Sequence, residues 1–300
     1  MTEVMVRTNN GKGGLFSARA ATDAMMQKER RKVVAAALSR CLSEGMMSSS
    51  TEIENLLDGM AERISQGKKL YQRWKQQMGS KMRELAVPNP VLKTFLVTYV
   101  LPCIKRFPVH ACAHGGEPGW SVERSLRTHL PLKRVFSFDM RDAFGQIDEN
   151  RIFAFFYERM GAALDKEDER TEALSLLSSL CTVKRITGGR MLPQGSPISA
   201  ALFNRVLYPL DEGLHAHADQ KGMRYSRWID DFILSCNEIC RADRFSDILK
   251  QAELEIMIAQ NKIFFQHNAC YLLGYRIDKG VISKVTKEEG ERIRGRYGGS

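Results

Sequence analysis

Hydrophobic and polar residues repeat with two different periods along the chain, and the change falls near residue 133. Before that point apolar residues recur every three or four positions over long stretches, which is the spacing of helices that bury one side. After it, short apolar runs of the kind that form β-strands alternate with helical segments. This order of elements predicts an α+β protein.

The first part of the chain is predicted to be mainly helical. Residues 17–45 contain no Pro or Gly before the last position, so one helix can run through them. Ser50 or Thr51 can cap a second helix over residues 51–65. This region is also rich in Lys and Arg.

A basic loop is predicted over residues 67–88, which leads into Pro88 and Pro90. Residues 91–107 then have the apolar spacing of a buried helix. A glycine-rich turn region follows over residues 110–121.

From residue 133 onward the predicted strands and helices alternate. The β-like runs are residues 133–139, 224–230, 231–236, 262–266 and 271–277. The helical segments between them are residues 148–160, 169–180 and 199–217.

The charge of the chain narrows the classes of partner. Lys and Arg number 45 against 35 Asp and Glu, which gives a formal net charge of +10, so a polyanion such as nucleic acid or an anionic membrane fits. The alternative is that the positive charge only keeps the protein soluble and binds no particular partner. No apolar run approaches the roughly 20 residues that span a bilayer, and the N-terminus lacks the apolar region of a signal peptide, so we expect a cytoplasmic protein without a membrane partner.

Carboxylates stand at the ends of apolar β-like runs in two places. Asp139 follows one run, and the pair Asp230 and Asp231 lies between two others. An Asp-Asp pair can be purely structural, because Asp favours tight turns. Three carboxylates brought together would repel each other, however, unless a hard cation lies between them. Two Mg²⁺ ions about 4 Å apart clamp the oxygens of an in-line phosphoryl displacement, and Mn²⁺ is an alternative ion.

Several segments of this chain, taken in their order along the sequence, resemble reverse transcriptases of the prokaryotic type, which are found in retrons, group II introns and phage-defence systems. The resemblance covers roughly residues 80–277. Its main motifs are FSFDMRDAFGQID, LPQGSPISAALFN and YSRWIDDFILSC, supported by KMRELAVPNPVLK, GGEPGWS, NKIFFQ and YLLGYRI. Each segment alone is a weak signal, and their common order makes a chance match implausible.

The resemblance implies a right-hand polymerase fold, with a palm of antiparallel strands, mixed fingers and little or no thumb. A helical N-terminal extension would occupy residues 1–79, and a short tail or rudimentary thumb residues 278–300. Residues 80–277 would form the polymerase. Its fingers would take about residues 80–130 and 150–190, and its palm about residues 131–149 and 191–277.

The resemblance also implies a role for each residue that matches a motif. Asp139 and Asp230 would bind the metal ions directly, and Asp231 would support the second ion or the primer end. Phe144 would be the steric gate that excludes a 2′-OH and so selects deoxynucleotides; otherwise it is a core residue.

The remaining matched residues would contact the nucleotide. Gln194 and Gly195 would lie against the incoming base and sugar, where a side chain at Gly195 would block the close approach of the backbone. Arg83, with Lys81 nearby, would grip the triphosphate, unless both belong to a solvated basic face. Lys262 would assist the pyrophosphate leaving group, or is only a charge at a strand edge.

The expected activity is RNA-directed DNA synthesis by addition of deoxynucleotides to a 3′ end. An RNA-dependent RNA polymerase shares the palm, but Phe144 argues against it. A non-catalytic RNA-binding scaffold is the alternative from another class, and the intact set of three aspartates argues against that. Retron DNA synthesis, intron mobility and anti-phage defence share these motifs, and defence is favoured because no endonuclease or maturase segment follows the palm.

The expected partners are an RNA template and a DNA product. After residue 277 only 23 residues remain (300 − 277), fewer than a helical thumb needs. We therefore expect an assembly, either a homo-oligomer or a complex with a second protein subunit, around a structured non-coding RNA.

Overall fold

The computed structural model describes residues 25–42, 50–78, 81–131, 133–186, 188–236, 242–265, 269–286 and 288–289. Within it the chain forms two compact units. The first unit comprises residues 1–100 and 149–196, and the second comprises residues 101–148 and 197–300. Helices and strands occur in both units, so the predicted mixture of the two is confirmed. Of the helices in the described ranges, none is both long and apolar enough to cross a bilayer.

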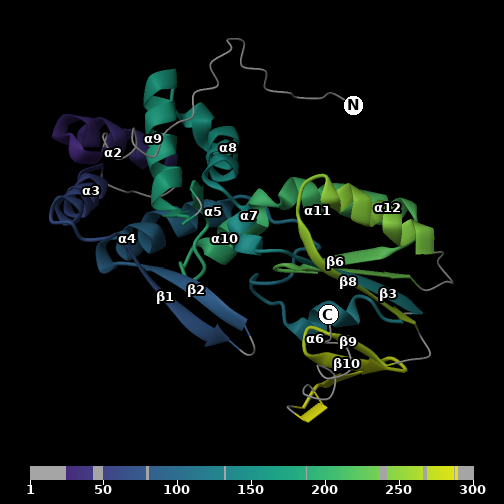
Figure 1. Cartoon of the computed structure of the whole chain (residues 1–300). Helices are drawn as coiled ribbons and strands as arrows, with labels where there is room; N and C mark the ends of the chain where they lie inside the picture. The colour runs from purple at the N-terminus through teal and green to yellow at the C-terminus, as the bar shows by residue number, and fades with distance from the viewer. Residues whose placement is uncertain are drawn as a thin grey trace. The chain divides into compact units, whose positions relative to one another are not determined.

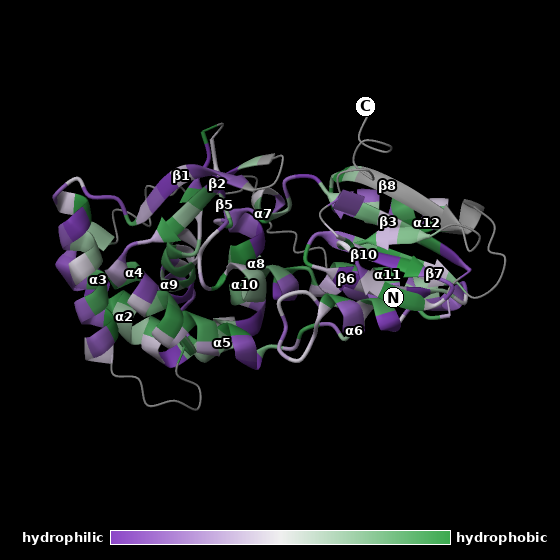
Figure 2. Ribbon diagram, turned by 90° about the horizontal axis from the view of Figure 1, so that it is seen from below, coloured by the Kyte–Doolittle hydropathy of each residue, from purple (hydrophilic) through white to green (hydrophobic). Residues whose placement is uncertain are grey.

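The helices of the first unit pack through mixed apolar and polar surfaces. They are α2 (Lys28–Leu42), α3 (Ser50–Ser65), α4 (Pro90–Phe95), α8 (Glu149–Met160) and α9 (Glu167–Leu180). Helix α2 packs against both α3 and α9, and Figure 2 shows hydrophobic and hydrophilic residues alternating along all three. Ion pairs join α2 to both neighbours: Arg31 of α2 binds Asp58 of α3, and Arg40 of α2 binds Glu169 of α9.

The predicted basic loop over residues 67–88 is wrong, because this stretch forms a β-hairpin. Strands β1 (Tyr71–Met78) and β2 (Lys81–Pro88) pair antiparallel along their whole length, from Tyr71 opposite Pro88 to Met78 opposite Lys81. Most side chains of β1 are exposed, so the strand never shows the apolar alternation of a half-buried strand. The smaller hairpin of β4 (Val183–Lys184) and β5 (Arg190–Met191) also lies in this unit.

The predicted helix over residues 91–107 is present but interrupted. Helix α4 begins after Asn89, whose side chain accepts a hydrogen bond from the Leu92 amide at 3.0 Å. A π-helical turn, η1 (Leu96–Val100), follows α4, and α5 (Leu101–Arg106) begins the second unit. The apolar spacing therefore predicted the helix correctly, and it could not locate the π-helical turn.

A four-stranded antiparallel sheet organises the second unit. Its strands lie in the order β6 (Arg224–Trp228), β7 (Asp231–Cys236), β3 (Arg134–Met140) and β8 (Ile258–Phe265). One face packs against helices α11 (Tyr208–Gln220) and α12 (Ala242–Glu253), as Figure 1 shows. We call this the helical face of the sheet. Aromatic rings fill it, with Phe138 stacked on Phe232 at 4.6 Å and Phe136 at 5.4 Å from Phe245.

The opposite face of this sheet packs against a smaller sheet and a short helix. The smaller sheet consists of β9 (Cys270–Leu272), β10 (Tyr275–Asp278) and β11 (Val281–Lys284), and the helix is α6 (Val122–Arg127). Val135 of β3 and Ile233 of β7 are buried in the apolar cluster between them. The predicted single run over 271–277 divides into β9 and β10, because a turn at Leu273 and Gly274 has positive φ at both positions.

The helix predicted over residues 199–217 is likewise two helices. Helix α10 (Ser199–Val206) ends at Val206, Leu207 separates it from α11, and α11 has Pro209 in its first turn. A proline is well suited to a first turn because it lacks the amide hydrogen that an interior position must donate. The short helices α7 (Ala143–Gln146) and η2 (Gly161–Ala163) complete the described helices.

His129 should make the stability of the fold depend on pH. Its ring is 1% exposed, and its nitrogens lie 2.7 Å and 2.8 Å from the hydroxyls of Ser226 and Ser235. Burial, helped by the nearby His114, lowers the pKa of His129 to about 3 from an ordinary 6.5. Because the unfolded chain then binds the proton more readily, the free energy of unfolding should fall as the pH drops below about 6.5 towards 3.

We expect His129→Gln to remove part of this slope, which for one group reaches about 1.4 kcal/mol per pH unit. The measurement is urea unfolding of both proteins at pH 7.0 and 5.5, where Asp and Glu titrate little. Equal losses of stability in the parent and the variant would show that His129 is not the cause.

Candidate active site

Three aspartates meet at one end of the four-stranded sheet. Asp139, near the end of β3, lies directly opposite Asp231, the first residue of β7. Directly opposed residues of antiparallel strands project from the same face, with Cβ atoms about 5 Å apart. Asp230 precedes Asp231 in the turn from β6, and its carbonyl accepts a hydrogen bond from the Met140 amide at 3.0 Å. All three aspartates are half-buried.

The face from which Asp139 and Asp231 project follows from the register of the sheet. Side chains alternate along a strand, so Asp139 shares its face with Val135, and Asp231 shares its face with Ile233. That is the face opposite the helical face. Asp139 and Asp231 therefore stand at the end of a buried row that contains Val135 and Ser137 of β3 and Ile233 of β7.

This donor set suits a hard divalent cation, because carboxylate oxygens are the ligands that Mg²⁺ and Mn²⁺ select. Within the described ranges, no three His, Cys, Asp or Glu side chains already converge to form a metal site. The backbone thus brings the three carboxylates to one place, and their side chains would turn to complete a site.

Phe144 lies in α7, five residues after Asp139, and is half-buried. Its ring packs against Phe203 of α10, with the centroids 5.2 Å apart and the planes tilted by 39°. The residue before Ala143, Asp142, has a left-handed backbone with φ of 46°, which turns the chain sharply between β3 and α7. Phe144 is therefore fixed on one side by Phe203 and is not enclosed in the core.

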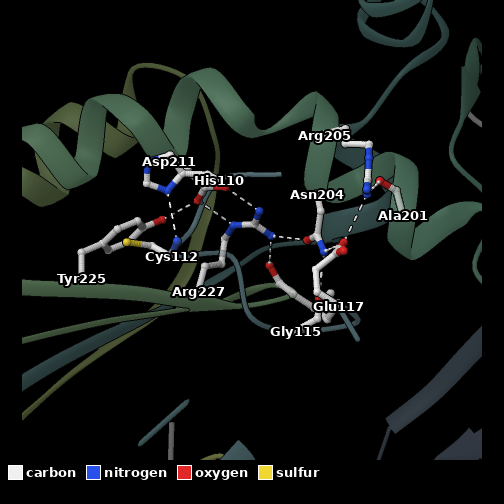
Figure 3. A network of polar contacts seen from close by, with 11 residues as sticks. His110, Cys112, Gly115, Glu117, Ala201, Asn204, Arg205, Asp211, Tyr225 and Arg227 are labelled. Atoms are coloured by element: carbon white, nitrogen blue, oxygen red, sulfur yellow. Dashed lines mark hydrogen bonds and ion pairs between the residues drawn. The ribbon is translucent and has the colours of Figure 1, made fainter. Parts of the chain in front are cut away.

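A polar network lies on the helical face of the sheet (Figure 3), and Arg227 connects it to the turn before Asp230 through the Ile229 carbonyl. Arg227 of β6 and Asp211 of α11 form its centre, and both are 0% exposed. Arg227 donates from Nε and Nη2 to the two carboxylate oxygens of Asp211, at 2.8 Å and 2.6 Å. The Tyr225 hydroxyl donates to the same carboxylate at 2.6 Å, and burial together with Asp211 raises the pKa of this tyrosine.

The network extends from Arg227 to helix α10 and to the loop over residues 113–117. Asn204 of α10 accepts a hydrogen bond from Arg227 and donates to the Gly115 carbonyl and to Glu117. Arg205 pairs with the same Glu117 at 3.2 Å. The sequence motifs contain both Asn204 and Arg227, but they give Arg227 no role, and Asp211 lies outside them. Two features of the sequence could have indicated these residues: Arg227 is a charged residue within an apolar strand, and Asp211 lies on the apolar side of a helix.

The loop over residues 113–116 lies directly against the turn. Ala113 forms an isolated parallel bridge with Arg227, and the Arg227 carbonyl accepts from the amides of His114 and Gly115. A Cβ atom on Gly115 would lie 2.4 Å from the Ile229 nitrogen and 2.8 Å from the Trp228 carbonyl carbon. The motif therefore requires glycine at position 115 for close contact between two backbones.

We expect Gly115→Ala to destabilise the protein by about 1–3 kcal/mol, because the backbone must shift to admit the methyl group. Gly213→Ala is the matched control, since its added Cβ meets nothing within 4 Å and alanine favours helix α11. Urea unfolding of both variants measures the difference. A Gly115→Ala variant as stable as the control would show that the loop does not depend on this contact.

In the first unit, Gln194 and Gly195 are attached to strand β2. The Gln194 carbonyl accepts a hydrogen bond from the Ala86 amide at 2.7 Å. Gly195 has φ of +111°, and a Cβ there would lie 3.3 Å from Val87 and 3.4 Å from the Ala86 carbonyl. Its backbone conformation therefore favours glycine, and the space beside β2 leaves little room for a side chain.

For Arg83, Lys81 and Lys262, the structure gives the strand position of each residue, and it describes the side chain of Arg83 alone. Arg83 lies in β2 opposite Gln76, is half-buried, and forms no ion pair with any residue in the described ranges. Lys81 begins β2, and Lys262 lies in β8 opposite Ser137. The side chains of both lysines lie outside the described part of the structure.

Comparison with known proteins identifies the family. The model of the family "Reverse transcriptase (RNA-dependent DNA polymerase)" matches residues 75–277, more than half of the chain. The Mx162 retron reverse transcriptase of Myxococcus xanthus is 32% identical over 165 residues, which cover 52% of this chain and 33% of that protein.

Two further retron relatives agree. The Mx65 reverse transcriptase of the same organism is 29% identical over 54% of this chain and 39% of its own length. The Ec86 reverse transcriptase of Escherichia coli is 22% identical over 70% of this chain and 60% of its own length. The chain thus spans less than two thirds of the length of these relatives. The family match covers all the motifs that place Asp139, Asp230 and Asp231 together, and the chain belongs to the reverse transcriptase family.

Proposed function

We propose that this protein is an RNA-directed DNA polymerase that adds deoxynucleotides to the 3′ end of a primer. The observation that carries the proposal is the meeting of Asp139, Asp230 and Asp231 at one end of the antiparallel sheet, within a chain of the reverse transcriptase family. In this proposal the four-stranded sheet is the palm, and the β1–β2 hairpin belongs to the fingers.

The three aspartates would hold two Mg²⁺ ions. Asp139 and Asp230 would be the direct ligands, and Asp231 would support the second ion or the primer end. When bound, the ions lower the pKa of the attacking 3′-OH and neutralise charge on the departing pyrophosphate. The role of the chain would be to hold the backbones that carry these carboxylates, and the β3–β7 register and the hydrogen bond of the Asp230 carbonyl support that role.

Residues of the first unit would bind the nucleotide. Arg83 is suited to the triphosphate because its guanidinium forms no ion pair with a described residue and can bind a phosphate through two donors. Lys81 would add charge nearby. Gln194 and Gly195 would contact the base and sugar, and Lys262 of the second unit would assist the leaving group.

Primer extension tests the proposal. The purified protein should extend a DNA primer on a mixed-sequence RNA template when dNTPs and Mg²⁺ are present, and EDTA should stop the reaction. Replacing dNTPs with rNTPs separates a DNA polymerase from an RNA polymerase. A protein that binds the primer–template but incorporates neither kind of nucleotide would be the non-catalytic scaffold, and the proposal would be wrong.

The relatives favour a retron-like setting, in which DNA is copied from a structured RNA. Sequencing of the nucleic acid that copurifies with the protein tests this, and one recurrent structured RNA is the expected result. A random sample of cellular RNA would contradict it. A role in anti-phage defence stays a prediction. Assembly with a second copy or with a second protein subunit is also a prediction, and light scattering of the protein with and without nuclease treatment would test it.

A further inference from the structure

Arg227 is the largest side chain that is fully buried in the described structure, and its burial needs an explanation. Burial alone would lower the pKa of its guanidinium, but the carboxylate of Asp211 outweighs this and the pKa is raised. Arg227 therefore stays charged, with both of its donors to Asp211 within 2.8 Å. A buried ion pair is a poor way to gain stability, because desolvation offsets most of the attraction and an apolar pair often serves as well. A specific role for the charge is the better explanation.

The remaining hydrogen bonds of Arg227 indicate that role. From Nη1 it donates to the Ile229 carbonyl at 2.8 Å and to the Asn204 side chain at 3.0 Å. Ile229 has φ of +56°, a conformation that a β-branched residue rarely adopts and that costs about 1–3 kcal/mol. Ile229 is also the residue immediately before Asp230. Arg227 thus holds the one strained residue of this turn through its carbonyl.

The contact comes from the side of the sheet away from Asp139 and Asp231. Arg227 lies opposite Phe232 in the register, so it occupies the helical face, whereas Asp139 and Asp231 project from the other face. Its guanidinium lies beside the rings of Phe203 and Phe232, at 5.5 Å and 6.0 Å. Arg227 can therefore fix the turn without touching the reacting atoms.

We propose that Arg227, anchored by Asp211, is a positioning residue that keeps the Ile229–Asp230 turn in its strained conformation and so sets the position of the Asp230 carboxylate. The consequence for catalysis rests on the proposed function. The conformational part does not, because it concerns only the turn.

Hydrogen–deuterium exchange of the free protein tests the conformational part. In Arg227→Lys, the single ammonium cannot bind both oxygens of Asp211 and also reach Ile229. Amides of residues 229–231 should then exchange about tenfold faster or more, because the turn opens more often. Arg31→Lys is the matched control: the Arg31 side chain of α2 is 11% exposed and, like Arg227, binds an aspartate, Asp58, and a backbone carbonyl, that of Met25, but it belongs to the first unit and not to this network.

Kinetics test the catalytic part. We expect Arg227→Lys to lower kcat roughly 10- to 100-fold, because a displacement of about 1 Å at a catalytic group costs this much. The KM for dNTP should stay within about twofold, since Arg227 does not contact the nucleotide. Arg31→Lys should keep kcat close to the parent value. If the parent extends a primer and Asp230→Asn does not, the proposed function stands whatever Arg227→Lys does.

A second-site variant distinguishes loss of the turn conformation from general misfolding. Glycine adopts positive φ without strain, so Ile229→Gly should restore part of the lost protection and kcat in the Arg227→Lys background. If Arg227→Lys alone fails to fold, the double variant should still fold. The proposal is overturned if exchange at residues 229–231 and kcat change no more in Arg227→Lys than in Arg31→Lys. It is also overturned if Ile229→Gly restores neither folding nor activity.

Discussion

Asp230→Asn should abolish DNA synthesis while leaving the protein folded. The amide keeps the shape of the carboxylate and loses the charge that attracts the metal ions. Metal ions contribute several kcal/mol to the transition state of phosphoryl transfer, and each 1.4 kcal/mol is a factor of ten, so the loss should be roughly 10³-fold or more. The fold should persist because Asp230 contributes its backbone carbonyl, and not its carboxylate, to the bond with Met140.

The measurement is primer extension under single-turnover conditions, with circular dichroism and thermal unfolding to confirm the fold. Asp219→Asn, at an exposed position of α11, is the matched control and should behave like the parent. Activity of Asp230→Asn within about tenfold of the parent would show that its carboxylate is not a direct metal ligand.

Phe144→Ala should make the enzyme accept ribonucleotides. If the Phe144 ring lies under the sugar, its removal opens the space that a 2′-OH needs. The preference for dNTP over rNTP, expressed as the ratio of kcat/KM values, should fall by about tenfold or more, the usual scale of a steric filter. The structure is compatible with this role, because Phe144 is half-buried and held by Phe203 rather than enclosed in the core.

Competition between labelled dNTP and rNTP in one extension reaction measures the ratio. Phe153→Ala removes another half-buried ring, which packs against Tyr157 of α8, and should leave the ratio unchanged. A Phe144→Ala variant with the preference of the parent would reduce Phe144 to a packing residue for α10.

Strands that are buried on both faces could be predicted well from the sequence. The run over residues 231–236 coincides with β7, because continuous apolar residues between polar ones leave little freedom in register. The β1–β2 hairpin was missed for the opposite reason. Its strands are stabilised by pairing with each other and its side chains are largely exposed, so no hydrophobic period marks it.

The aspartates could be found from sequence because they stand at the ends of apolar runs, and the β3–β7 pairing brings Asp139 opposite Asp231. The network behind them could not. The role of Arg227 depends on Asp211 lying above β6 and on the left-handed conformation of Ile229, and both are properties of the folded chain. Motif matching also cannot show which backbone contact requires Gly115, since the contact joins residues more than 100 positions apart.

Template-directed choice of nucleotide tests the central claim most directly. The purified protein is given oligo(dT) on poly(rA), or oligo(dG) on poly(rC), with all four dNTPs and Mg²⁺. The account predicts that dTTP alone is incorporated on the first template and dGTP alone on the second, and that Asp230→Asn incorporates neither. Incorporation that ignores the template, or that persists undiminished in Asp230→Asn, would contradict an RNA-directed polymerase centred on these aspartates.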